Sequence, residues 1–177
     1  MEDLEKFGEA LRLVERYEAY LFKRALGILE RNLGSDHPDM AYPLSNLANV
    51  YKDTGNYEQA EKIYLRSLGI LERALGPDHP LVVTSLTNLG NMYRARGNFE
   101  QAQKMLRRAL RFREKTLGPD HPLVAVPLNN LAYVHMVKGD YEQAEQMYKK
   151  ALSIWERAMG PDHSEVAYPL RGLGSVY

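Results

Sequence analysis

The sequence predicts an all-α solenoid of stacked antiparallel helix pairs, and three observations support this fold class. The segment from residue 39 to residue 80 recurs along the 177-residue chain with a shift of 42 residues, as from His37 to His79. Each copy carries two apolar stripes with helical spacing, and a glycine follows each stripe. A fixed period of this size is typical of stacked supersecondary units, none of which can bury its apolar face alone.

Several residue types recur in the same phase of this repeat. They are His37, His79, His121 and His163; Gly34, Gly76, Gly118 and Gly160; Gly55, Gly97 and Gly139; Ala60, Ala102 and Ala144; and Leu47, Leu89, Leu131 and Leu173. The small alanines are predicted where the two helices of a pair approach most closely. The phase predicts complete repeats at residues 39–76, 81–118 and 123–160 within a single solenoid domain, residues 1–177.

Each complete repeat is predicted to be a helical hairpin. In the first repeat the apolar stripes are Leu44, Leu47, Ala48 and Tyr51, then Tyr57, Ala60, Ile63, Tyr64, Leu68, Leu71 and Leu75. Gly55 is predicted to end the first helix, and Asn56 to cap the second. Gly76 is predicted to end the second helix, and Asp78 to cap the next one ahead of Pro80.

The two ends of the chain depart from the complete repeat. In residues 1–33 Leu13 takes the position of Gly55, so one long helix or two poorly separated helices are expected to cover the stack. Helical spacing is kept there by Leu4, Phe7, Leu11 and Val14. Residues 165–177 are expected to form a half repeat or cap. Its apolar residues lack a second-helix partner, so it is expected to serve as a lid, to continue into a longer array, or to meet a second copy.

Proline stands a few residues into the first helix of three repeats, at Pro43, Pro127 and Pro169. Proline is tolerated in the first turn of a helix but costs about 3 kcal/mol deeper in it. These helices are therefore predicted to begin late, near Met40 or Ala41 and the equivalent positions, or to bend at the proline.

Composition argues against several classes of function. Lys plus Arg equals Asp plus Glu at 23 each, so no net charge draws the chain to nucleic acid or to an anionic membrane. The chain has no cysteine, which excludes disulfides, thiol catalysis and thiolate metal sites. No apolar run reaches the roughly 18 residues of a spanning helix, and no signal peptide is expected at the N-terminus. A soluble cytoplasmic protein is expected.

The phased residues resemble the tetratricopeptide repeat (TPR). The family signature is Leu, Leu-Gly or Leu-Ala, Tyr, Ala and an aromatic residue, and it is matched by Leu44, Leu47-Ala48, Tyr51, Ala60 and Tyr64. The Leu-Gly-Pro-Asp-His-Pro linker and the long unit are similar to those of kinesin light chains and of many bacterial arrays attached to signalling ATPases. The resemblance covers residues 15–177. It implies a right-handed superhelix whose first helices line a concave groove that holds an extended peptide, as kinesin light chains hold cargo peptides with a Trp beside acidic residues.

Carried over position by position, the resemblance assigns the peptide groove to one face of each first helix. The implied groove residues are Tyr42, Ser45, Asn46, Asn49, Lys52 and Asp53; Thr84, Thr87, Asn88, Asn91 and Arg94; Val126, Asn129, Asn130, Tyr133, Met136 and Val137; and Arg171. The amides of Asn46, Asn88 and Asn130 share one phase, and an amide can donate to and accept from a peptide backbone. A ladder of contacts to a strand-like ligand is therefore expected.

The charges of the implied groove indicate which ligand it would take. The clamp of chaperone-type arrays for a terminal carboxylate needs Lys or Arg where this sequence has Ser45, Thr87 and Asn129, so that mode is not expected. Cations at Lys52, Arg94 and Arg171 outnumber Asp53, which favours an acidic ligand. Tyr133 and Met136 offer it an apolar contact.

Structural alternatives stand beside these interpretations. The phased asparagines could instead bridge neighbouring helices. The four linker histidines are expected to cap and pack, because equivalent residues of adjacent hairpins lie about 10 Å apart while Zn–N bonds are about 2 Å. His135 replaces an in-phase tyrosine and is interpreted as a satisfied core histidine. Trp155, in the phase of Leu71, is interpreted as interior packing. No catalytic residue, cofactor or metal site is predicted, and the protein is not expected to be an enzyme.

Three functions follow, in order of preference. The first is a binding module that holds a protein or peptide ligand in its groove. The second is a scaffold that associates with a second copy through the edge at residues 170–177. The third is weak nucleic-acid contact through the basic residues Lys104, Arg107, Arg108, Arg111, Arg113 and Lys115, although a solvated outer face is the simpler interpretation of these charges.

Overall fold

The structure, a computed structural model, describes the backbone of residues 2–177 and the side chains from residue 13 onward. The described residues form helices joined by short turns, with no strand among them. In chain order the helices are α1 (Glu2–Leu33), the 3₁₀ turn η1 (Pro38–Met40), α2 (Ala41–Asp53), α3 (Tyr57–Leu75), α4 (Pro80–Ala95), α5 (Phe99–Leu117), α6 (Pro122–Val137), α7 (Tyr141–Met159), η2 (Ser164–Val166) and α8 (Ala167–Val176). The helices are those of an all-α repeat array, and no described helix is long and apolar enough to cross a membrane.

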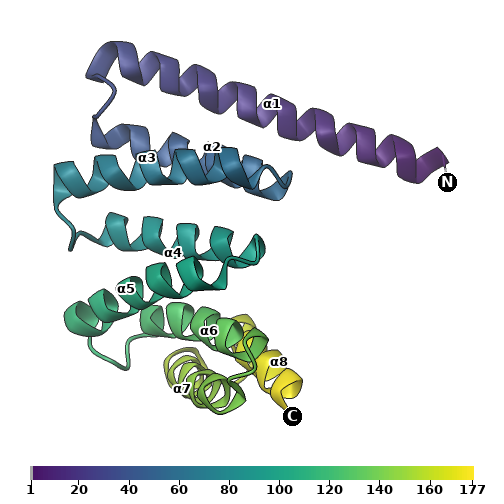
Figure 1. Cartoon of the computed structure of the whole chain (residues 1–177), viewed down its shortest axis with the longest axis vertical. Coiled ribbons are helices and arrows are strands. Elements are labelled where there is room, and N and C mark those ends of the chain that lie inside the picture. Colours follow the sequence, from purple (N-terminus) through teal and green to yellow (C-terminus); the bar gives the residue numbers. More distant parts are fainter. Residues whose placement is uncertain (1) are drawn as a thin grey trace. The chain divides into compact units, whose positions relative to one another are not determined.

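The chain divides into two compact units, Met1–Ser85 and Leu86–Tyr177, and the division falls inside α4. In unit 1, α2 and α3 form an antiparallel pair and α1 lies along α2 (Figure 1). The core of unit 1 gathers Leu26 of α1, Met40, Leu44, Leu47 and Ile70. The single-domain prediction for residues 1–177 stays a prediction.

The first helix is one continuous element. Of the two alternatives expected for residues 1–33, the structure has the single long helix, because no glycine interrupts the chain at Leu13. The side chains of Leu4, Phe7 and Leu11 lie outside the described residues. The C-terminal half of α1 contributes Ala19, Phe22 and Leu29 to the core of unit 1, so this half takes the packing role of a second helix.

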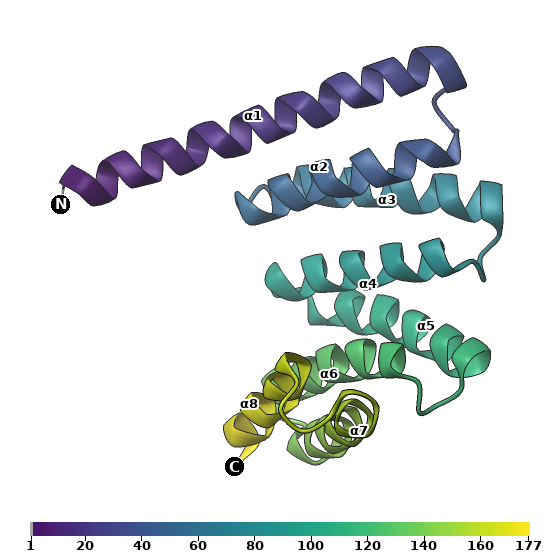
Figure 2. The same cartoon turned by 180° about the vertical axis from the view of Figure 1, so that it is seen from behind.

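In unit 2, α6 and α7 form an antiparallel pair, and α8 packs across α7 and beside α6 (Figure 2). One buried cluster joins Val124 and Leu128 of α6 to Ile154 and Trp155 of α7, closed by Val166. Trp155 is 3% exposed, which confirms its interpretation as interior packing. The small residues of a pair also meet: Ala132 and Ala144 lie in one cluster with Tyr148, and Leu173 and Val176 of α8 pack against it.

The hairpin turns are built as the sequence predicts. Gly55, Gly97 and Gly139 have φ of 78°, 83° and 81°, a left-handed conformation that a residue with a Cβ adopts at a cost. The Asn56 side chain accepts a hydrogen bond from the Gln59 amide at 3.3 Å. This bond satisfies one of the free amides at the start of α3.

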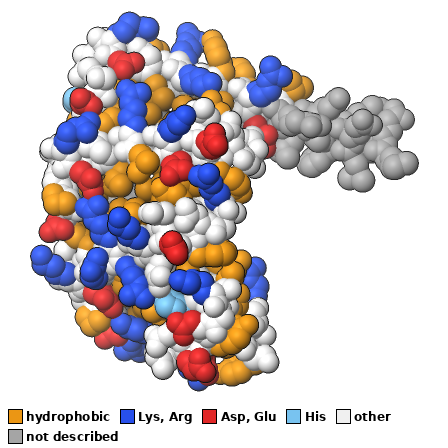
Figure 3. Space-filling model, in the orientation of Figure 1, with side chains coloured by type: hydrophobic (Ala, Val, Ile, Leu, Met, Phe, Trp, Pro, Cys, Tyr) orange, Lys and Arg blue, Asp and Glu red, His pale blue; other side chains and the backbone are white. Residues whose placement is uncertain are grey.

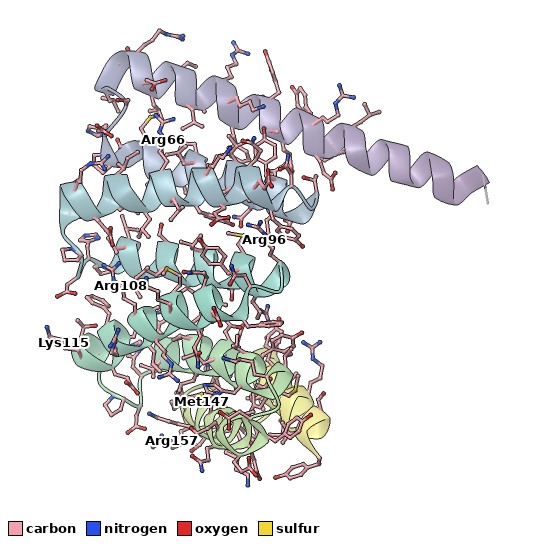
Figure 4. The ribbon with its side chains drawn as sticks, in the orientation of Figure 1. Arg66, Arg96, Arg108, Lys115, Met147 and Arg157 are labelled. Atoms are coloured by element: carbon pink, nitrogen blue, oxygen red, sulfur yellow. The ribbon has the colours of Figure 1, made fainter. Side chains whose placement is uncertain are left out.

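The linker cap differs from the prediction. Each linker histidine, not the aspartate before it, caps the following helix: its Nδ1 accepts from the backbone amide two residues on, at 3.2 Å. The aspartate stands one residue before this capping position. Two of the linker aspartates instead accept a hydrogen bond from an arginine on the second helix of the following repeat. The pairs are Asp36 with Arg73 and Asp120 with Arg157, both at 2.7 Å. Figure 4 labels Arg157 on α7.

A second set of ion pairs joins the second helices of neighbouring repeats within each unit. Arg66 of α3 donates to Glu30 of α1 at 3.2 Å, and Lys150 of α7 donates to Glu114 of α5 at 3.0 Å. Figure 3 shows basic and acidic side chains interspersed over this face of the chain. Exposed pairs of this kind contribute about 0 to 1 kcal/mol each, so they add little to the stability of either unit.

The prolines behave in two ways. The helices α2 and α8 begin at Ala41 and Ala167, each after a 3₁₀ turn, so Pro43 and Pro169 fall in the first turn as predicted. For the helix that contains Pro127, the predicted late start is wrong. The helix α6 begins at Pro122, directly after its His121 cap, and therefore carries Pro127 in its interior.

Candidate peptide-binding pockets

In unit 1 the predicted groove residues of α2 divide into exposed and bonded ones. Tyr42 is 76% exposed, whereas the Ser45 hydroxyl lies 3.2 Å from that of Ser67 on α3. Asn49 accepts a hydrogen bond from the Tyr64 hydroxyl, and Lys52 pairs with Asp53 at 3.1 Å. Asn49, which is not one of the phased asparagines, therefore bridges α2 and α3.

Asn46 and Asn49 line a cavity of about 400 Å³ between α1 and α2, named here the unit 1 pocket. Its other lining residues are Val14, Glu15, Glu18, Phe22, Val50 and Asp53. This lining is acidic, contrary to the predicted excess of cations. The prediction missed Glu15 and Glu18 because the first 33 residues lack the hairpin turn and were not assigned a groove face.

In unit 2 the structure brings six predicted groove residues together around a cavity of about 290 Å³, named here the unit 2 pocket. The lining residues are Arg94 of α4; Asn129, Asn130, Tyr133 and Met136 of α6; Tyr148 of α7; and Tyr168, Arg171, Gly172 and Ser175 of α8. The other predicted groove residues of unit 2 are not part of this lining: Thr87, Asn88, Asn91, Val126 and Val137. Thr87 is only 6% exposed, so it offers a ligand little surface.

The unit 2 pocket is cationic. Two arginines, Arg94 and Arg171, line it, and no Asp or Glu does. The Arg94 guanidinium lies over the ring of Tyr133, 4.8 Å from its centroid, an arrangement that holds the cation in place. No ion pair joins Arg94 or Arg171 to a carboxylate among the described residues, so both charges are available to a ligand.

Three polar atoms at predicted groove positions of unit 2 are buried and make no hydrogen bond to the described residues. They are Oδ1 of Asn91, Nε of Arg94 and Oδ1 of Asn129. A buried polar group without a partner costs about 1 to 3 kcal/mol. These three atoms are covered by protein, so Arg94 and Asn129 can contact a ligand in the unit 2 pocket only through their other atoms.

Tyr148 lies at the base of the unit 2 pocket and was not predicted as a site residue. It is 2% exposed, and it packs so closely against α8 that a Cβ at Gly172 would lie 2.3 Å from the Tyr148 ring. Burial raises the pKa of Tyr148 to about 12, and the nearby cations Arg94 and Arg171 oppose this rise. The hydroxyl therefore stays protonated and can donate. Tyr64 stands at the same repeat position, so the sequence does show a recurring tyrosine on the second helix. The repeat position alone does not show whether this tyrosine lines a pocket.

His135 is a satisfied core histidine, as predicted. It is 7% exposed; its Nδ1 lies 2.7 Å from the Asp140 carboxylate and its Nε2 3.1 Å from the Gln103 amide nitrogen. Since the carboxylate can only accept, Nδ1 donates and Gln103 donates to Nε2. Asp140 consequently makes no capping bond to α7, unlike Asn56 at the start of α3.

The basic residues of α5 differ in whether their side chains are already bonded within the protein. Arg113 donates to the carbonyl of Leu123, and burial lowers the pKa of Arg113. Lys104, Arg107 and Arg111 are exposed. No group of histidine and acidic side chains among residues 13–177 is placed to hold a metal ion.

Comparison with known proteins places these helices among repeat proteins. A tetratricopeptide repeat family model matches residues 39–115, 92–135 and 123–177. No protein of curated function matches the sequence.

Three solved structures illustrate the likeness. The crystal structure of BtubC (BKLC) from P. vanneervenii aligns over 99% of this chain and 68% of its own, with a TM-score of 0.80 and 25% identity. The nearly identical TPR-like repeats of a putative kinesin light chain from Podosopora anserina align over 100% and 88%, with a TM-score of 0.75 and 22% identity. The Sgt2 TPR domain from Aspergillus fumigatus aligns over 77% and 76%, with a TM-score of 0.56 and 21% identity.

Proposed function

Because the chain belongs to the tetratricopeptide repeat family, with repeats of the kinesin light chain type, it is a protein–protein interaction module, and we propose that the unit 2 pocket holds an extended peptide segment. Proteins of this family are typically scaffolds without catalytic activity.

The observation that carries the proposal is the polar and cationic lining of the unit 2 pocket. Arg94, Asn129, Asn130 and Arg171 line one cavity. A peptide backbone offers alternating N–H and C=O groups, so one bound segment can accept from the arginines and pair with the amides.

The pocket lining supports an acidic peptide with an apolar anchor. Arg94 and Arg171 attract a carboxylate, and no acidic residue of the lining opposes it. Met136 and the ring of Tyr133 offer an adaptable apolar surface next to these cations. The unit 1 pocket, with Glu15, Glu18 and Asp53, does not share this preference.

A peptide selected against the 177-residue chain from a displayed random library tests the proposal. The double variant Asn129→Ala with Asn130→Ala removes both amides of the pocket lining and should bind this peptide about tenfold more weakly, because two hydrogen bonds to the ligand are lost. Its melting temperature should fall by no more than a few degrees. Isothermal titration calorimetry and thermal unfolding give the two numbers.

The matched control is Gln101→Ala with Gln143→Ala, which removes two exposed amides from α5 and α7. The control should bind like the unaltered chain. A large loss of stability in the Asn129 and Asn130 variant would show that these amides are structural, and equal affinities in both variants would exclude them from the peptide contact.

Self-association is a second candidate, favoured by the exposed apolar side chains of α8. Leu170 is 51% exposed and Tyr168 50% exposed, whereas Leu173 and Val176 pack against the unit 2 core. Sedimentation equilibrium should show a mass that rises with concentration from 20.3 kDa toward that of a dimer. Leu170→Lys should hold the chain as a monomer, because a charge would be buried at the contact. A monomer at every concentration excludes this function.

A further inference from the structure

We propose that the unit 2 pocket prefers a phosphorylated side chain over a carboxylate, so that its partner is a phosphorylated protein segment. This inference rests on the proposed peptide-binding function and names the ligand group that Arg94 and Arg171 receive.

The number of donors around the pocket favours phosphate. A single arginine satisfies a carboxylate with two parallel hydrogen bonds. Here two guanidinium groups, Arg94 and Arg171, line one cavity together with Tyr148. A phosphomonoester brings three acceptor oxygens and about −1.5 to −2 charges at pH 7, which matches two cations and an additional hydroxyl.

The Tyr148 hydroxyl is a third hydrogen-bond donor, which a phosphate group can use and a carboxylate held by the two arginines does not need. Tyr148 is 98% covered by protein and lines the cavity, yet its hydroxyl makes no hydrogen bond to the described residues. In unit 1 the equivalent Tyr64 hydroxyl is used internally, because it donates to Asn49. In unit 2 the position of Asn49 holds Tyr133, whose ring packs under Arg94. The Tyr148 hydroxyl is thereby left for a ligand oxygen.

The geometry also favours a side chain attached to a peptide over free phosphate. The lining extends beyond the two arginines to Asn129, Asn130 and Met136. Free phosphate can pair with the arginines and Tyr148 but cannot contact Met136. A phosphorylated segment can use both parts of the pocket at once.

The test uses three acetylated seven-residue peptides of alanine and glycine that differ only in the central residue: phosphoserine, serine or glutamate. Inorganic phosphate is a fourth probe. Binding to the ¹⁵N-labelled 177-residue chain is followed through the Gly172 amide and the Arg94 Nε–H signals. The phosphoserine peptide should bind about tenfold more tightly than the serine peptide and about threefold more tightly than the glutamate peptide or inorganic phosphate.

Variants separate the contribution of each donor. Arg171→Gln should weaken binding of the phosphoserine peptide about tenfold and should abolish its advantage over glutamate. Tyr148→Phe, which removes only the hydroxyl, should reduce the phosphoserine advantage while leaving affinity for the glutamate peptide unchanged. Arg111→Gln, which neutralises an exposed arginine of α5, should change nothing.

The pH dependence of peptide affinity is a further test, because it would not change if Arg171 and Tyr148 only stabilised the fold. The second phosphate pKa is about 6, so lowering the pH from 7.5 to 5 should weaken the phosphoserine peptide more than the glutamate peptide. Equal affinity for the phosphoserine and glutamate peptides would overturn the inference while leaving peptide binding intact. Inorganic phosphate that binds as tightly as the phosphopeptide, or an equal loss from Arg111→Gln and Arg171→Gln, would also overturn it.

Discussion

Replacing Trp155 with alanine should lower the free energy of unfolding of unit 2 by about 3 to 5 kcal/mol, because it removes the largest side chain of a closed cluster. Trp155 is 3% exposed and shares this cluster with Val124, Leu128, Ile154 and Val166. These residues come from both helices of one pair and from the turn that leads into α8. The cavity left by alanine would loosen all three elements together.

The matched control is Trp155→Leu, because leucine stands at the same phase in unit 1, at Leu71. Leucine fills part of the cavity and should cost roughly half as much as alanine. Urea unfolding followed by far-UV circular dichroism gives both values. Since a repeat array can unfold in parts, the alanine variant should show an earlier, separate transition for unit 2. Equal midpoints for the unaltered chain and the alanine variant would contradict the packing described here.

Replacing Gly172 with alanine should displace α8 from α7 and destabilise unit 2 by about 1 to 3 kcal/mol. The new Cβ would lie 2.3 to 2.7 Å from three ring carbons of Tyr148, closer than side chains pack, and the buried ring has little room to move. Gly172 stands in the phase of Asn46, Asn88 and Asn130. The ladder of amides therefore ends at α8 because Tyr148 occupies the space that a side chain there would need.

Gly174→Ala provides the control in the same helix, since nothing lies within 4 Å of a Cβ at that position. This variant should be neutral or more stable by up to about 1 kcal/mol, through helix propensity alone. Thermal unfolding and amide hydrogen exchange in α8 measure both effects. In a Tyr148→Ala background, Gly172→Ala should become nearly neutral. A cost that is the same in both backgrounds would refute the contact as its cause.

The two pockets show how far groove chemistry can be predicted from phase. The six lining residues predicted for the unit 2 pocket lie on first helices whose register is set by local spacing, so their shared face could be predicted. Tyr148 and the acidic side chains of the unit 1 pocket could not. Tyr148 belongs to a second helix, and Glu15 and Glu18 belong to a helix that has no hairpin turn and hence no assigned face.

The sequence by itself determined the repeat length, the helix pairs, the left-handed turn glycines and the small residues between paired helices. Each of these depends on residues a few positions apart, through helical periodicity and turn chemistry. Only the tertiary structure decided which distant groups meet: His135 with Gln103, Asp120 with Arg157, and Tyr148 beneath Gly172. A sequence pattern assigns a side chain to a face of its helix, but its partner depends on the distance and orientation of another helix 30 or so residues away, which packing alone fixes.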